Sequence, residues 1–256
     1  MNWKTFFALM SRDALIARRN IVTTLMQNLL QPLMLTFVFG RILTSSGMMA
    51  GSYKNVLLPG IISISMVMGG IWSVGMPLIS EFQFTREIED RLLAPIEPHW
   101  LAVQKVIAGM LQALVSGLIV IPAGWLVMGA GVNLDFSHPF EFLLVTLMVA
   151  LLASAGGLTL GCSVGQAQIG IMFSMIIAPM MMFGCAYYPW ESLKAFPGLQ
   201  YAVLINPLVY ASEGLRGALA PQVPHISLPV VVAALALLDV MFLVIGLHRF
   251  RRKAVS

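Results

Sequence analysis

Charge is the scarcest property of this sequence. Only 10% of the 256 residues are Asp, Glu, Lys or Arg, while 59% are hydrophobic and the mean hydropathy is +0.88. A soluble domain of this size would have too little polar surface to cover so much apolar mass. The composition therefore excludes an ordinary soluble protein and predicts an integral membrane protein. The apolar runs do not alternate strictly with polar residues, so we expect an all-α membrane protein and not a barrel.

Cysteine and histidine are also rare, which removes several kinds of chemistry. The two cysteines, Cys162 and Cys185, fall within or at the edge of apolar runs, and we expect buried thiols without a disulfide. The four histidines lie at the ends of apolar runs without the spacing of metal ligands. No catalytic triad and no Gly-x-x-x-x-Gly-Lys-Ser/Thr phosphate loop is present. We therefore expect no enzyme active site, no metal site and no cofactor in this chain, and no basic stripe predicts nucleic acid binding.

Six apolar runs are long enough to cross a bilayer. Each meets the length that a hydrocarbon core of roughly 30 Å demands at about 1.5 Å per residue. We expect residues 1–256 to form a single transmembrane domain. Its predicted spans are 21–40, 55–79, 101–128, 140–164, 168–188 and 227–247. Residues 2–19 predict an amphipathic helix in the membrane plane, because Trp3 and Phe7 fall on one helical face and Lys4 and Arg12 on the other.

The distribution of cations predicts the orientation. Cytoplasmic loops of membrane proteins carry an excess of Lys and Arg. With both termini inside, eleven cations are cytoplasmic: Lys4, Arg12, Arg18, Arg19, Arg86, Arg91, Lys105, Arg249, Arg251, Arg252 and Lys253. The four on the outer side are Arg41, Lys54, Lys194 and Arg216. We therefore expect a multi-pass protein with both termini in the cytoplasm.

Residues 193–212 are apolar enough to suggest a seventh span, but prolines interrupt them. Pro197 and Asn206-Pro207 divide the run into pieces too short to cross, and Glu213 and Arg216 follow at once. A seventh span would also place the basic carboxyl-terminal cluster outside. We expect residues 189–222 to form two short re-entrant helices in the outer leaflet, packed on protein or lining a cavity.

A dense island of charge separates the second and third spans. Five of the six residues Arg86–Arg91 are ionisable, so the segment must lie in water. Thr85 suits a helix N-cap, Ile88 and Leu92 share one apolar face, and Pro95 ends the pattern. These signals predict a helix over residues 85–94 on the membrane surface. A solvated loop that only fixes topology is the alternative, and charge pattern alone does not decide between them.

Three motifs together resemble a known family. They are Leu57-Leu58-Pro59-Gly60, the island Arg86-Glu87-Ile88-Glu89-Asp90-Arg91-Leu92-Leu93-Ala94-Pro95-Ile96, and Ile205-Asn206-Pro207-Leu208-Val209-Tyr210 with Gly214-Leu215-Arg216-Gly217. In their order and over essentially the whole chain, they look like the type-2 ABC transporter permeases, the group of daunorubicin-resistance and nodulation-factor exporters.

The resemblance implies a partner and a contact site. Such permeases form dimers of six-span subunits above two copies of a separate ATPase chain, which binds ATP and Mg. The resemblance assigns a cytoplasmic coupling helix to the island, and its residues here are Arg86, Glu87, Ile88, Glu89, Asp90, Arg91, Leu92 and Leu93. It implies export of an amphipathic, lipid-linked or drug-like substrate across a bacterial inner membrane, by a homodimer or by a pair with a similar chain. The alternatives are a secondary transporter driven by an ion gradient and a non-transporting scaffold.

Two further patterns give candidate residues inside the membrane. Methionine is flexible and polarizable and suits surfaces that accept varied apolar groups, and a proline kinks a helix. The candidate pathway residues are Met172, Met175, Pro179, Met182 and Asp239. The simpler interpretation is that the methionines lie in the core or face lipid. In the same interpretation Asp239 only makes a hydrogen bond between helices, with Gln27, Asn28, Gln31 or Gln112 as its partner. The small residues Ala153, Gly157, Gly161 and Gly165 recur every fourth position and predict close helix packing, within the subunit or in a dimer.

Overall fold

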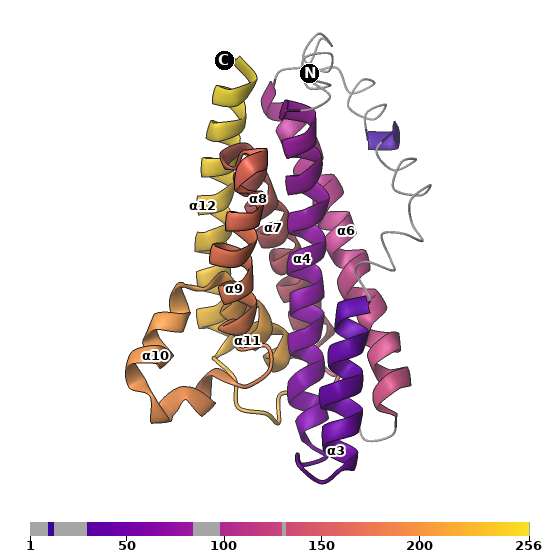
Figure 1. The fold of residues 1–256 in the computed structure, drawn as a ribbon. Helices are drawn as coiled ribbons and strands as arrows, with labels where there is room; N and C mark the ends of the chain where they lie inside the picture. The colour runs from indigo at the N-terminus through magenta and orange to yellow at the C-terminus, as the bar shows by residue number, and fades with distance from the viewer. Residues whose placement is uncertain (1–9, 13–29, 84–97, 130–131, 256) are drawn as a thin grey trace.

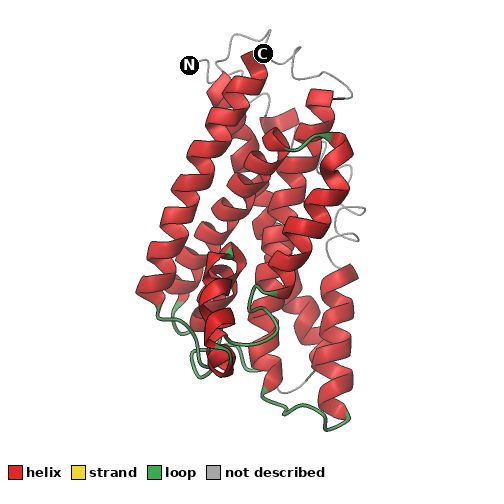
Figure 2. Ribbon diagram, turned by 60° about the vertical axis from the view of Figure 1, so that its left-hand side comes forward, coloured by secondary structure: helices red, strands yellow, loops and turns green. Residues whose placement is uncertain are grey.

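The computed structural model describes residues 10–12, 30–83, 98–129 and 132–255. Throughout these ranges the regular secondary structure is helical and no residue lies in a β-strand (Figure 2). This confirms the prediction of an all-helical membrane protein. The predicted in-plane helix over 2–19, apart from one turn at residues 10–12, and the predicted helix over 85–94 lie outside the described residues.

Four helices are long and apolar enough to cross a membrane. They are α4 (Tyr53–Gln83), α6 (Pro98–Met128), α7 (Pro139–Ser163) and α12 (Leu228–Val255) (Figure 1). α7 is the shortest, and its 25 residues extend over about 37 Å at about 1.5 Å per residue. The predicted spans 55–79, 101–128 and 140–164 fall on α4, α6 and α7. The predicted 227–247 ends before α12 does, because the helix continues through its basic carboxyl-terminal residues.

Two further apolar helical stretches are shorter than a bilayer is thick. Residues Leu30–Ser45 include η1 (Thr36–Ile42) and α3 (Leu43–Ser45), so the helix predicted over 21–40 continues to residue 45. Residues Ile169–Met182 comprise α8 (Ile169–Met172), η3 (Phe173–Ile177) and α9 (Ala178–Met182). The helix predicted over 168–188 thus ends at Met182, and residues 183–189 are not helical.

The hairpin, which we define as residues 189–222, contains four short helical elements where the sequence predicts two re-entrant helices, and their placement in the outer leaflet stays a prediction. η4 (Trp190–Ala195), α10 (Pro197–Ala202) and η5 (Val203–Ile205) lead into α11 (Pro207–Leu219). Pro197 and Pro207 each occupy the first turn of a helix, where a missing N–H is tolerated. Asn206 caps α11 by accepting a hydrogen bond from the Leu208 amide at 2.9 Å. α11 packs against α4, α7 and α12, while α10 lies to one side of the bundle (Figure 1).

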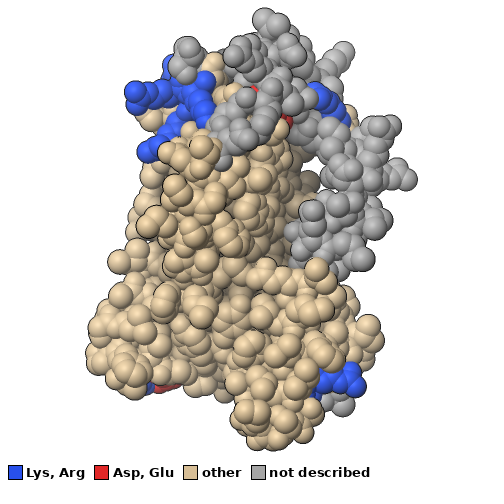
Figure 3. All heavy atoms as spheres, viewed as in Figure 1, with Lys and Arg blue, Asp and Glu red and all other residues tan. Residues whose placement is uncertain are grey.

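Apart from Asp239 on α12, the charged side chains of the described residues lie toward the two ends of the bundle. The basic end, defined by residues 249–253 of α12, also holds the last turn of α4, where Lys253 lies 4.7 Å above the Phe82 ring. The opposite end, which we call the hairpin end, holds Arg41 and Lys54. Among the described residues, the middle of the face shown in Figure 3 exposes no charged side chain. Such a belt between two polar ends matches the environment of a bilayer.

Close packing of α4 on α7 depends on glycine. A Cβ on Gly157 would lie 2.9 Å from the Ile71 carbonyl oxygen, and one on Gly161 would lie 2.9 Å from the Gly75 carbonyl oxygen. The structure therefore places this part of the small-residue stripe within the subunit, against α4. Ala153 meets Gly70 in the same contact, whereas Gly165 lies beyond the end of α7.

Candidate functional site

A buried ion pair lies at the centre of the hairpin end. Glu213 and Arg216 are three residues apart on α11, and both side chains are 0% exposed. The Arg216 guanidinium donates to the Glu213 carboxylate, and its Nη2 also donates to the Cys185 carbonyl at 2.7 Å. Desolvation lowers the pKa of Arg216 from its ordinary value, and the Glu213 carboxylate opposes that shift. Two charges removed from water in this way need several partners to be tolerated.

The Glu213 carboxylate supplies those partners by binding backbone amides from two other segments. Its Oε1 accepts from the Trp190 amide at 2.9 Å, and its Oε2 accepts from the Ile226 amide at 2.9 Å. The first amide begins η4 and the second precedes α12. One buried carboxylate thus joins α11 to the start of the hairpin and to the approach of the last long helix.

The non-helical residues 183–189 are held by side chains of α11 and its cap. Ser212 donates to the Gly184 carbonyl at 2.6 Å, and Asn206 donates to the Met180 carbonyl at 2.8 Å. With the Arg216 bond to Cys185, these contacts satisfy carbonyls that have no helical partner. Irregular backbone within a membrane protein is stable only when such groups are satisfied by protein.

The same segment approaches α4 at a glycine. A Cβ on Gly60 would lie 1.8 Å from the Ala186 carbonyl oxygen, so no larger residue fits without displacing the backbone. Gly60 is the last residue of the Leu57-Leu58-Pro59-Gly60 motif, and Leu57 and Leu58 are both fully buried. Gly60 is therefore the point of the motif at which α4 meets residues 183–189, whereas Leu58 lies against Gly124 of α6.

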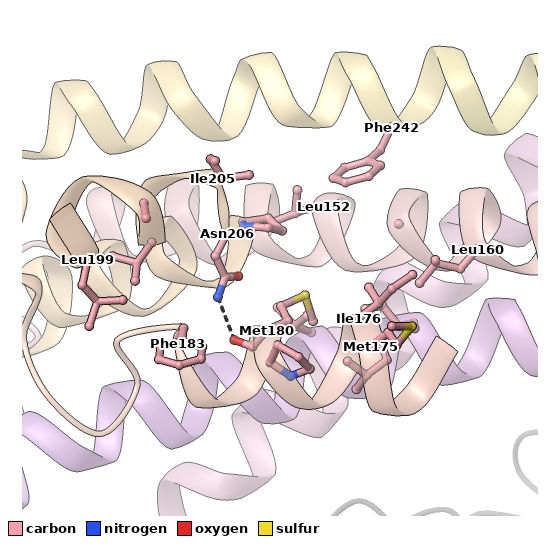
Figure 4. Close-up of a pocket in the computed structure, with 18 residues that line it drawn as sticks. Leu152, Leu160, Met175, Ile176, Met180, Phe183, Leu199, Ile205, Asn206 and Phe242 are labelled. Atoms are coloured by element: carbon pink, nitrogen blue, oxygen red, sulfur yellow. Dashed lines mark hydrogen bonds between the residues drawn. The ribbon is translucent and has the colours of Figure 1, made fainter. Parts of the chain in front are cut away.

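An apolar groove lies beside this arrangement, with a volume of about 510 Å³. Its walls come from α4, α7, η3, α9, α10, η5 and α12. Phe242 points into the groove from α12, facing Met180 and Ile176 on the opposite wall (Figure 4). Asn206 carries the only polar side chain among the described lining residues, and its amide donates to the Met180 carbonyl. The groove therefore offers a surface for apolar groups.

The structure separates the five predicted pathway residues. Met175 and Pro179 line the groove, and Met175 is 74% exposed. Met172 is buried and Met182 is exposed, and neither lines the groove. Pro179 lies in the first turn of α9, directly after the π-helical turn η3, so the expected disturbance of the helix occurs there. Their role in transport stays a prediction.

Asp239 lies on α12, one turn before Phe242, and is only 4% exposed. Its Oδ1 is buried and has no hydrogen-bond partner among the described residues. No hydrogen bond joins it to the described candidates Gln31 and Gln112, and Gln27 and Asn28 lie outside the described ranges. Its contribution to a pathway also stays a prediction.

A second buried ion pair lies at the basic end. The Lys105 ammonium of α6 is 2.5 Å from a Glu81 carboxylate oxygen of α4, and both side chains are less than 10% exposed. These two helices enter and leave residues 84–97, where the coupling helix is predicted. Below the pair, Leu78, Leu101 and Phe250 belong to one buried cluster that also includes residues of α7. The ends of four helices are therefore packed together beneath the predicted contact site.

Neither buried pair was anticipated from the sequence. The sequence pattern indicates Glu213 and Arg216 as a polar boundary that follows an apolar run, and Lys105 as a cytoplasmic-side cation near the start of the predicted span 101–128. The i, i+3 spacing of Glu213 and Arg216 on a short helix was an available signal for pairing, although not for burial. Glu81 and Lys105 are 24 residues apart, and only their placement on both sides of the charged island hinted at a contact.

Comparison with known proteins identifies relatives of the chain. A family model described as ABC-2 type transporter matches residues 4–220. The chain is also similar to the inner membrane transport permease YadH of Escherichia coli (strain K12), of Escherichia coli O157:H7 and of Shigella flexneri. Each is 27% identical over 204 residues, which cover 76% of this chain and 75% of the relative.

Proposed function

Because the chain belongs to the ABC-2 type transporter family, we propose that it is the membrane-spanning permease subunit of an ATP-driven exporter in a bacterial inner membrane. The family match over residues 4–220 is the observation that carries this proposal. The relatives are named inner membrane transport permeases, which supports the location. The apolar surface between the two polar ends, seen on the face in Figure 3, fits the membrane-embedded body that such a subunit needs.

The proposed topology has six spans and both termini in the cytoplasm. The four long helices provide four of these spans, and the helical stretches Leu30–Ser45 and Ile169–Met182 form parts of the first and fifth spans. The second of these helical stretches extends over only about 21 Å at about 1.5 Å per residue, so residues 183–189 complete the crossing as irregular backbone held by α11. The basic end faces the cytoplasm, and the hairpin is re-entrant from the outer side.

The proposed energy source is a separate ATPase that binds ATP and Mg. Two ATPase copies lie below a homodimer of this chain, and residues 86–93 contact them as coupling helices. A ligand shifts a conformational equilibrium only by its differential affinity for the two states, so nucleotide binding in the partner must supply the difference. The path for an amphipathic, lipid-linked or drug-like substrate runs beside Met172, Met175, Pro179, Met182 and Asp239.

Purification of the chain with its ATPase tests this function. A tagged chain isolated gently from its native membrane is expected to bring down a phosphate-loop ATPase. In proteoliposomes that ATPase should hydrolyse ATP several-fold faster with the chain than without it. The chain alone should leave imposed proton and sodium gradients intact. Dissipation of either gradient by the chain alone, with no stimulation of an ATPase, would favour a secondary transporter instead.

The Glu81–Lys105 pair is expected to transmit motion between α4 and α6. Glu81→Lys or Lys105→Glu alone places two like charges in a buried site, and breaking a buried pair costs about 3–5 kcal/mol. Each single variant should melt at a lower temperature and lose most stimulation of the ATPase. The double variant E81K/K105E restores opposite charges. It should recover at least half of the lost melting temperature and at least half of the lost ATPase stimulation. Equal damage in the double variant and the singles would show that the pair does not act as a unit.

A further inference from the structure

We propose that the apolar groove binds one acyl chain of a glycerophospholipid from the outer leaflet. The assignment of the groove to the outer leaflet rests on the proposed function, because the proposed six-span topology places the hairpin at the outer face of the membrane. The proposed site is distinct from the coupling contact and requires no nucleotide. Four properties of the groove support it: its chemistry, its direction, its opening and a glycine in its wall.

The chemistry of the wall selects a purely hydrocarbon ligand. Asn206 is the one polar side chain among the described lining residues, and both of its polar atoms are occupied, by the Leu208 amide and the Met180 carbonyl. A drug-sized ligand is normally fixed by a few convergent polar groups, which this wall does not offer. Water also needs polar partners to occupy a cavity. An acyl chain needs neither, and it restores the dispersion contacts that an empty groove would lack.

The groove runs along the helix axes. Its α7 wall extends from Leu152 to Leu160, about 12 Å at about 1.5 Å per residue. Ile205 and Leu199 lie at its hairpin side, and Met175 lies toward the basic end (Figure 4). Lipid chains also run along the membrane normal, so the hollow and its ligand share one direction.

The groove opens to the surface that faces the bilayer. Ile205 is 84% exposed and Met175 is 74% exposed, whereas Val67 and Ile177 form buried parts of the wall. On the adjoining α10 segment, Phe196 and Tyr201 are exposed, and exposed aromatic residues favour the headgroup level. A lipid would therefore place its headgroup beside the hairpin and its chain in the groove.

Gly156 provides a position at which a larger side chain would enter the groove and at which a Cβ is accommodated. It lines the groove, and a Cβ built on it meets only Ile71 Cγ1, at 4.0 Å, which is ordinary contact. Gly156→Leu should occupy space that the lipid chain takes. Gly170→Leu is the matched control, because Gly170 lies outside the groove and a Cβ there meets nothing within 4 Å.

Photo-crosslinking of the full chain in nanodiscs tests the site. The probe is a phosphatidylethanolamine with a diazirine either near the ester or near the methyl end of one acyl chain, and mass spectrometry locates the adducts. We expect ester-end adducts on Leu199 or Ile205 and methyl-end adducts on Met175 or Leu160. Groove adducts should fall at least fivefold in Gly156→Leu and remain unchanged in Gly170→Leu.

Two results would overturn the site. Adducts spread evenly over exposed apolar residues such as Leu111 and Leu237, with no excess in the groove, would show general bilayer contact only. Efficient crosslinking of Met175→Cys to a second copy of the chain, with loss of groove adducts, would show that the groove is covered by protein. Because the wild-type map is decisive on its own, poor folding of Gly156→Leu would not rescue the proposal. The measurement needs no ATPase, so failure of the proposed function would be seen separately.

Discussion

Replacing Arg216 with methionine is expected to abolish most of the folded protein in the membrane. The change removes a cation that is 0% exposed and leaves the Glu213 carboxylate charged in a site without water. Breaking a buried pair in this way costs about 3–5 kcal/mol, a large part of the stability of a typical domain. It also removes the hydrogen bond to the Cys185 carbonyl. In detergent, the monodisperse fraction should fall at least tenfold, and any remaining protein should melt well below the wild type.

Two comparisons separate the buried charge from its geometry. In E213Q/R216M neither charge remains. The loss of stability in the double variant should therefore be smaller than the sum of the losses in the two single variants. Lys194→Met removes one partner of the exposed Glu191–Lys194 pair, which has the same i, i+3 spacing, and should change stability by less than about 1 kcal/mol. A wild-type melting curve for Arg216→Met would mean that the ion pair does not hold the hairpin in place.

The long helices could be predicted because the bilayer imposes both their length and their composition. The predicted span 140–164 and α7 differ by one residue at each end. At α12 the prediction of 227–247 ended too early, since hydropathy falls at His248 and Arg249 while the helix continues into the polar region. Composition thus predicts where a chain lies in hydrocarbon, but not where hydrogen bonding ends a helix.

The details of the hairpin end could not be read from local pattern. Proline positions indicate two short helices over 189–222, and the structure has four helical elements there, of which η4 and η5 are 3-10 helices. Burial of Glu213 and Arg216 depends on residues 183–189 and on Ile226, which meet only in three dimensions. A charged residue after an apolar run is usually solvated, so sequence alone favoured that interpretation. α9 ends at Met182, next to the Met180 and Gly184 carbonyls that accept hydrogen bonds from Asn206 and Ser212.

The candidate site shows a similar division. The methionines and Pro179 were recognised by residue type, but only Met175 and Pro179 of the pathway residues line the groove. Phe242 and Leu152 could not be predicted as groove residues, because the local sequence does not indicate which face of a long apolar helix lines a groove. Glycine was more informative, since a four-residue repeat requires close approach wherever it packs. Gly157 and Gly161 meet α4, as helix packing within one subunit requires.

Reversing two charges in the island, with Glu87→Lys and Arg91→Glu together, is expected to uncouple the permease from its ATPase. These positions lie outside the described residues, and the expectation comes from the charged pattern and the family. The double change leaves the net charge unaltered but inverts the surface that a partner would meet, and like charges across an interface cost several kcal/mol. Co-purification of the ATPase should fall at least tenfold, and stimulated ATP hydrolysis should fall to the level of the ATPase alone.

A matched variant at the hairpin end of the bundle distinguishes contact from general damage. Glu191→Lys with Lys194→Glu is the same exchange of one acid and one base, on an exposed pair at the hairpin end. It should leave both co-purification and stimulation unchanged. The island variant should also insert and melt like the wild type, because Glu87 and Arg91 are expected on a solvated face. Undiminished recovery of the ATPase with the island variant would remove the coupling role from residues 86–93.

Because α4 and α6 are joined at Glu81 and Lys105 directly above the shared cluster of four helix ends, a push on the island would reach the whole bundle through that pair.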